Sequence, residues 1–61
     1  MKFYIDGKEV EFNEFNKKMK ADLKIDKDGD KKAAVFLKDM NNNTRRNNYT
    51  VNNKHYEIVR R

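Results

Sequence analysis

The four arginines of this 61-residue chain occupy only two places in the sequence. Arg45 and Arg46 stand side by side among asparagines, and Arg60 and Arg61 form a second pair. A guanidinium group is a planar fork that makes two-point contacts with phosphate or carboxylate, which the ammonium group of lysine does not. The two pairs therefore favour an anionic partner, and the plainer alternative is a solvated basic segment without a ligand.

The excess positive charge is concentrated in the last third of the chain. Residues 1–40 hold ten lysines against nine acids, whereas residues 41–61 hold four arginines and Lys54 against Glu57 alone. Seven of the nine asparagines also lie in this last third, and their amides can hydrogen-bond phosphate oxygens or base edges. This composition favours a nucleic acid or a ribonucleoprotein as the partner, with an acidic protein surface as the alternative.

The single histidine, His55, is the candidate for a catalytic base. A hairpin register described below sets it on one face with Thr50 and Glu57, a possible nucleophile and orienting acid. However, the chain has no serine or cysteine and only two glycines, and so small a domain has little room for a closed, dry site. No glycine-rich phosphate loop and no His/Cys cluster is present, so we expect neither an enzyme nor a cofactor.

Residues 26–30 read DKDGD and resemble the start of a calcium-binding loop. The resemblance fails at the sixth position, where Lys31 replaces glycine, and at the twelfth, where Leu37 replaces the bidentate glutamate. Lysines also crowd the three carboxylates. The segment therefore predicts a solvated turn without a metal ion.

Alternating apolar and polar residues predict a β-hairpin over residues 1–12. Asp6 and Gly7 suit a type I′ turn, whose two central residues both need positive φ. The register then sets Ile5 opposite Lys8, Phe3 opposite Val10 and Met1 opposite Phe12, and these apolar side chains share one face.

A helix is predicted over residues 14–24, lying across that hairpin. Asn13 is a competent N-cap, and Phe15, Met19 and Leu23 recur at four-residue steps as one apolar stripe. Residues 32–40, KAAVFLKDM, are then predicted as a strand because β-branched and aromatic residues stand at the centre. The alternative is that they extend the helical part. Residues 41–43, three asparagines, end this element.

A second hairpin is predicted over residues 44–61, turning on Asn52 and Asn53, because asparagine tolerates positive φ better than most residues. The register gives these pairs: Val51–Lys54, Thr50–His55, Tyr49–Tyr56, Asn48–Glu57, Asn47–Ile58, Arg46–Val59, Arg45–Arg60 and Thr44–Arg61. The two arginine pairs therefore meet at the open end of one hairpin. Like charges directly opposite destabilise a sheet, so either the ladder frays there or an anion binds.

In the same register Tyr49, Val51, Tyr56 and Ile58 share a face. We expect that face to be the core side and the two tyrosines to form a cross-strand pair within it. If the face were exposed, Tyr49 and Tyr56 would instead be able to stack on bases or to anchor a partner.

These elements predict a single small α+β domain over residues 1–61: an N-terminal β-hairpin, one helix, then a three-stranded antiparallel meander (ββαβββ), with the helix packed on one sheet face. No apolar run is long enough to span a bilayer and no signal-peptide pattern opens the chain, so we expect a cytoplasmic protein with no membrane partner. Because so small a core gains from doubling, a homodimer through edge strands is also possible.

The expected function is that of a non-enzymatic basic binding module for a polyanion. The residues expected to contact nucleic acid or another partner are Arg45, Arg46, Asn47, Asn48, Lys54, Arg60 and Arg61. The alternative is a small inhibitor or adaptor that blocks a larger host protein, such as a defence or nucleic-acid-processing enzyme. Very short, Lys- and Asn-rich proteins without cysteine are common among phage and mobile-element products of that kind.

Overall fold

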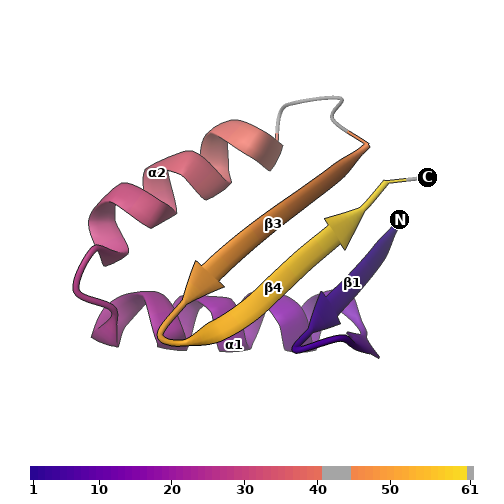
Figure 1. The fold of residues 1–61 in the computed structure, drawn as a ribbon, viewed down its shortest axis with the longest axis horizontal. Coiled ribbons are helices and arrows are strands. Elements are labelled where there is room, and N and C mark those ends of the chain that lie inside the picture. The colour runs from indigo at the N-terminus through magenta and orange to yellow at the C-terminus, as the bar shows by residue number, and fades with distance from the viewer. Residues whose placement is uncertain (41–44, 61) are drawn as a thin grey trace.

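The computed structural model describes residues 1–40 and 45–60, and Figure 1 shows the arrangement of the elements. The chain forms two hairpins separated by two helices. The elements are β1 (Lys2–Ile5), β2 (Lys8–Val10), α1 (Phe12–Ile25), α2 (Gly29–Met40), β3 (Arg46–Val51) and β4 (Lys54–Val59). The predicted α+β class is confirmed, but the described residues form two helices rather than one.

The four strands form one antiparallel sheet in the order β2-β1-β4-β3. Both hairpins have the predicted registers, with Phe3 opposite Val10 and Tyr49 opposite Tyr56. Their turns have positive φ at both central residues, 51° and 83° at Asp6 and Gly7 and 50° and 63° at Asn52 and Asn53. The two-residue turns therefore set the registers, as their sequences indicate.

The two hairpins are joined through their inner strands. β1 pairs with β4 over four residues, from Lys2 opposite Val59 to Ile5 opposite Tyr56. Beyond β4, the backbone N–H of Arg60 donates to the carbonyl of Arg45 at 2.8 Å, so the second ladder continues to that pair. The predicted pairing of Arg61 with Thr44 lies outside the described residues.

The predicted strand at residues 32–40 is wrong, because this segment belongs to α2. Alanine, leucine and lysine are strong helix formers, and a short apolar run does not by itself distinguish a strand from a helix. The helix buries Phe36, whereas Val35 and Leu37 on either side are exposed. A single inward residue with its two neighbours outside is typical of a helix that contacts the core by a narrow stripe.

Helix α1 agrees with the predicted helix but begins earlier. It starts at Phe12 after an extended Glu11, and no side chain caps its first turn, so the predicted cap at Asn13 is wrong. Phe12 is drawn into the helix by contact with Phe3, whose ring centroid lies 5.2 Å away. Phe15 and Met19 are buried as predicted, and Leu23 packs against the same core.

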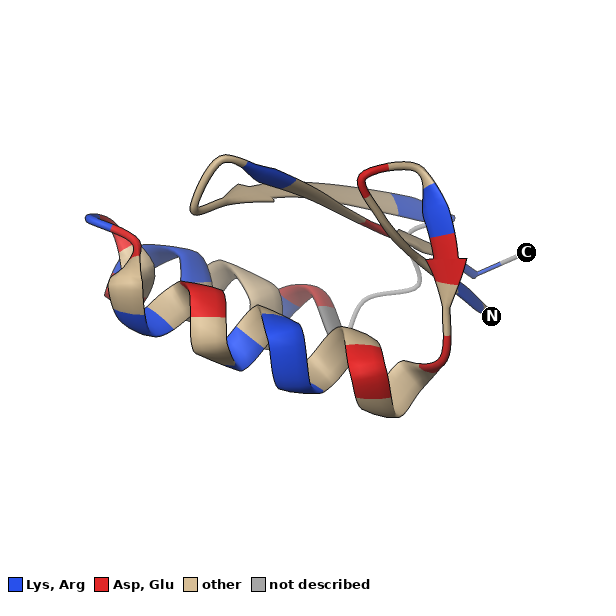
Figure 2. Cartoon of the chain, turned by 90° about the horizontal axis from the view of Figure 1, so that it is seen from below, with Lys and Arg blue, Asp and Glu red and all other residues tan. Residues whose placement is uncertain are grey.

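The core lies between the helices and one face of the sheet. Phe15 is its centre, with its ring 5.1 Å from that of Phe3 and 5.4 Å from that of Tyr56, in an edge-on contact. Phe36 of α2 meets Tyr49 of β3 in the same edge-on way at 5.5 Å. Both helices therefore cover the same face of the sheet (Figure 2), and the opposite face, here called the open face, has no layer over it.

The connection between the helices is tight. The backbone N–H of Gly29 donates to the carbonyl of Asp26 at 3.1 Å, and that of Lys32 donates to the carbonyl of Asp28 at 2.9 Å. A Cβ atom on Gly29 would lie 2.0 Å from the carbonyl oxygen of Leu23, so only glycine fits here without movement of the backbone. In the described part of the chain, no helix is long and apolar enough to cross a membrane.

Candidate functional site

The second hairpin brings Arg45, Arg46 and Arg60 to one end of the sheet, as predicted, but it distributes them over two sides. Arg46 lies on the open face, where its Nε is 3.0 Å from Oε2 of Glu57 and its side chain is 64% exposed. Arg60 turns toward the helices, and its Nη2 donates to the carbonyl oxygen of Asp39 at 2.9 Å. The predicted single cluster of guanidinium groups is therefore divided by the sheet.

The contacts of Arg60 have a structural reason. Asp39 stands in the last turn of α2, where carbonyl groups lack intrahelical partners and carry partial negative charge. The guanidinium group satisfies one of these carbonyls and also donates from Nη1 to Oδ1 of Asn47. Arg60 and Asn47 thus hold the end of α2 against the sheet.

Lys54 is far from the arginines in the structure. It follows the turn at the opposite end of β4, where its Nζ lies 3.4 Å from Oδ2 of Asp22. A strand of six residues spans about 17 Å or more, so Lys54 and Arg46 do not form one site. Lys54, which is predicted to contact the partner, therefore lies at the other end of the hairpin from the arginines.

The two tyrosines face the core and not the solvent. Tyr56 is fully buried and its hydroxyl donates to Asp22. Tyr49 is half-buried, and its hydroxyl donates to Oδ2 of Asp39 at 2.9 Å. Burial and these bonds to carboxylates raise the pKa of both phenols well above the usual value. Tyr56 has no exposed ring face for a base, and the core face of the sheet that holds Tyr49 is covered by helices.

The open face carries polar side chains of β3 and β4. Asn48 lies there, with its Oδ1 2.8 Å from Nε2 of His55. Thr50 stands directly opposite His55, but Glu57 is engaged by Arg46 and not by the histidine. The three groups considered as a nucleophile, base and acid share a face without forming an aligned hydrogen-bonded series.

Lys2 joins the arginines through a contact that the hairpins alone do not reveal. Lys2 of β1 and Arg46 of β3 both stand opposite Val59 of β4, which lies between them. The three residues therefore form one row across three strands. Antiparallel partners directly opposite each other project to the same side, which is the open face. Lys2 and Arg46, together with the exposed Arg45, whose pairing with Arg60 sets it on the helix side of the same end of the sheet, are called the basic edge below.

A shallow depression of about 390 Å³ lies beside the basic edge on the open face. Its floor and rim combine an aromatic ring, two cations and a carboxylate. The lining residues are Met1, Lys2, Tyr4, Arg46, Glu57 and Val59.

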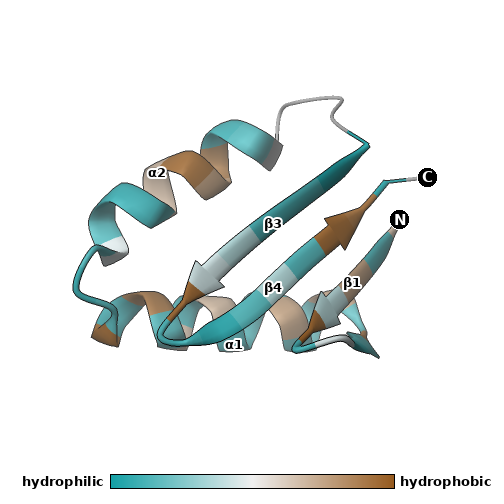
Figure 3. Ribbon diagram, viewed as in Figure 1, coloured by the Kyte–Doolittle hydropathy of each residue, from teal (hydrophilic) through white to brown (hydrophobic). Residues whose placement is uncertain are grey.

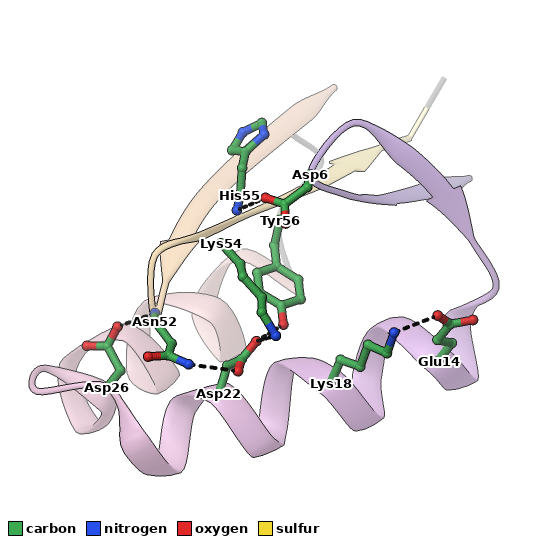
Figure 4. A network of polar contacts seen from close by, with 9 residues as sticks. All are labelled: Asp6, Glu14, Lys18, Asp22, Asp26, Asn52, Lys54, His55 and Tyr56. Atoms are coloured by element: carbon green, nitrogen blue, oxygen red, sulfur yellow. Dashed lines mark hydrogen bonds and ion pairs between the residues drawn. The ribbon is translucent and has the colours of Figure 1, made fainter.

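At the other end of the sheet, a polar network fastens the turn of the second hairpin to the helices (Figure 4). The buried Asp22 accepts from Nδ2 of Asn52 at 3.2 Å as well as from Tyr56. Asp26 accepts from the backbone N–H of Asn52 at 2.7 Å and from Nζ of Lys32 at 2.8 Å. The segment predicted as a solvated turn therefore also anchors the hairpin.

The network lowers the pKa of both carboxyl groups. Burial would raise the pKa of Asp22, but hydrogen bonds from Tyr56, Asn52 and Lys54 outweigh it and lower the pKa. The bond from Lys32, followed by those from the backbone of Asn52 and Asp28, lowers the pKa of Asp26 to about 2. Among the residues described, no three carboxylates or imidazoles are grouped so as to hold a metal ion.

We expect these shifts to make the protein acid-sensitive. Because the pKa of Asp26 is lower in the folded state than its ordinary 3.8, the stabilisation is present above that value and is lost as the pH falls from 3.8 to about 2. Urea unfolding followed by circular dichroism across this range measures the effect.

The matched control is Asp28→Asn, which removes an exposed acid from the same turn. We expect Asp26→Asn to flatten the dependence on pH and Asp28→Asn to keep it. Equal slopes for the two variants would contradict the assignment to Asp26.

No protein-family model matches the chain, and no curated protein or solved structure is significantly similar to it. The geometry of the described residues therefore carries the functional argument without support from relatives.

Proposed function

We propose that the protein is a non-enzymatic binding module for nucleic acid, which is a polyanion, and that the basic edge contacts it. The row of Lys2, Val59 and Arg46 carries this proposal, because it sets two cations on the same uncovered face at the end where Arg45 is exposed. Lys2 and Arg45 are both exposed among the residues that the structure describes.

The pairing of Arg46 with Glu57 is compatible with this role. The pair is exposed on the side of Arg46, at 64%, and less so at Glu57, at 20%. An exposed pair contributes about 0–1 kcal/mol, so the guanidinium group can exchange carboxylate for phosphate at low cost. Arg60 is not counted among the residues that contact phosphate, because it holds the end of α2. The basic edge therefore offers about three phosphate contacts.

A salt titration tests the proposal. With about three phosphates neutralised, log K should fall against log salt with a slope of about −2 to −3, through the release of counterions. Fluorescence anisotropy with a labelled duplex and a labelled single strand, between about 50 mM and about 200 mM salt, measures it. The variant Arg45→Ala/Arg46→Ala should lose most of the affinity at low salt and most of the slope.

The control removes the same charge from another surface. Lys20 and Lys24 are exposed residues of α1, and Lys20→Ala/Lys24→Ala should bind nearly as the parent does. An equal loss in both double variants would show that net charge and not the basic edge drives binding. No binding at low salt would remove the proposal.

A second candidate is a protein-binding inhibitor or adaptor, which one observation favours. Val35 of α2 is 51% exposed and lines an apolar depression with Tyr49 and Thr50, beside the edge strand β3. Apolar side chains next to an open strand edge are typical of surfaces that add a partner strand. Capture of a protein from lysate that persists after nuclease treatment would favour this candidate over the first.

A further inference from the structure

Tyr4 is set apart from the other aromatic residues. Six of the seven rings in the chain form one connected series of contacts on the helix side of the sheet: Phe3, Phe12, Phe15, Phe36, Tyr49 and Tyr56. Tyr4 follows the buried Phe3 in β1 and therefore projects to the open face. Its ring is half-buried, and in the described part of the chain its hydroxyl has no hydrogen-bond partner.

Charged residues stand next to Tyr4 in the sheet, and the apolar Met1 and Val59 line the depression beside it. Glu9 of β2 and Glu57 of β4 are its direct cross-strand partners. Lys2, two residues earlier in β1, lies on the same face. The depression of about 390 Å³ lies between Tyr4 and Arg46. A tyrosine that packs in no core and stands beside two cations over a hollow is typical of a surface that receives a planar ligand with an anionic group.

We infer that Tyr4 is a stacking platform for a base of single-stranded nucleic acid, laid across the open face with its phosphates at the basic edge. The inference rests on the proposed function and names the form of nucleic acid that the site accepts. A base has two π-faces that become available only when it leaves a duplex, so a tyrosine ring on the uncovered face of a sheet selects single strands. Lys2 and Arg46 lie on either side of Val59 in one row, where they would neutralise the phosphates.

The residues next to Tyr4 supply groups for base edges. Glu57 stands opposite Tyr4 on one side and opposite Asn48 on the other, so the three form a row across the open face. When phosphate replaces Glu57 as the partner of Arg46, the carboxylate becomes available to accept from N–H groups on base edges, such as N3–H of thymine or uracil. Asn48, bonded to the ring of His55, provides both an acceptor and donors.

The decisive variant is Tyr4→Val, which removes the ring and keeps a β-branched residue suited to a strand. Tyr4→Phe is the matched control, because it retains the stacking surface. The probes are a labelled single strand of about ten thymidines, the same length of uridines, a DNA duplex of that length, and inorganic polyphosphate as a competitor without bases. Circular dichroism and urea unfolding establish that each variant is folded.

We expect Tyr4→Val to weaken binding of the single strands by about 10-fold or more, and Tyr4→Phe to change it by less than about 3-fold. Competition by polyphosphate and binding of the duplex should stay within about 2-fold of the parent, because they depend on the cations alone. Binding of either single strand with this pattern supports the inference.

Two results would overturn it, and they are distinguishable. If Tyr4→Val binds all probes as the parent does while Arg45→Ala/Arg46→Ala loses them all, the stacking role is wrong and the polyanion function stands. If no probe binds the parent at low salt, both proposals fall. Should Tyr4→Val not fold, Tyr4→Leu is measured with the same probes and the same expectations.

Discussion

Replacement of Asp22 by alanine is expected to lower the free energy of unfolding by about 3 to 5 kcal/mol, the cost of breaking a buried charged network by removing one member. A domain of this size has a total stability of only about 3 to 9 kcal/mol, so the variant should lose about a third of its stability or more. The Asp22 residue is 4% exposed, and its carboxylate is the partner of the buried Tyr56 hydroxyl, of Asn52 and of Lys54. Urea unfolding monitored by circular dichroism measures the loss.

Two further variants separate the network from the general effect of losing an acid. Tyr56→Phe removes one donor and leaves the carboxylate with Asn52 and Lys54, so it should cost about 1 kcal/mol. Glu14→Ala removes an acid of the same helix whose only assigned partner is the exposed Lys18, and it should change the stability by about 1 kcal/mol or less. If Asp22→Ala were as mild as Glu14→Ala, the network would not hold the hairpin to α1.

Replacement of Gly29 by alanine is expected to cost about 3 kcal/mol. The new Cβ would lie 2.0 Å from the carbonyl oxygen of Leu23, which is backbone and cannot rotate away. Relief therefore requires movement of α1 relative to α2, and this movement disturbs the contact of Phe15 with Phe36, whose ring centroids are 6.3 Å apart. A shift in the midpoint of urea unfolding is the measurement.

Gly7 provides the matched control, because alanine is disfavoured there by the backbone conformation and not by a steric clash. A Cβ there would touch nothing within 4 Å, but the backbone has φ +83°, which an L-residue adopts at a cost of about 1 kcal/mol. We expect Gly7→Ala to be clearly milder than Gly29→Ala. The reverse order would show that the connection between the helices is not close-packed.

The hairpins were predictable because their information is local. Asp6–Gly7 and Asn52–Asn53 each supply two adjacent residues that accept positive φ, and a two-residue turn leaves no choice of register. The core side of the second hairpin follows from the same register, since Val51, Tyr56 and Ile58 are all buried. In Figure 3, β3 is hydrophilic for most of its length, as expected for a strand at the edge of the sheet.

The candidate site was less predictable because its geometry is not local. The row of Lys2, Val59 and Arg46 depends on the pairing of β1 with β4, for which neither hairpin contains a signal. The role of Arg60 depends on α2 ending at the sheet, and the prediction of a strand at residues 32–40 excluded such a partner. The wrong prediction of a strand at residues 32–40 therefore also led to a wrong environment for Arg60.

The strand order has a consequence for synthesis of the chain. β4 is the last described strand to be made, yet it lies in the interior of the sheet and is the only described link between β3 and the first hairpin. Until it leaves the ribosome, Phe3 and Phe15 have no Tyr56 to close over them, and no four-stranded sheet exists. Folding must therefore wait until β4 has been made, and a nascent chain paused before residue 54 should be open to proteolysis and to chaperones.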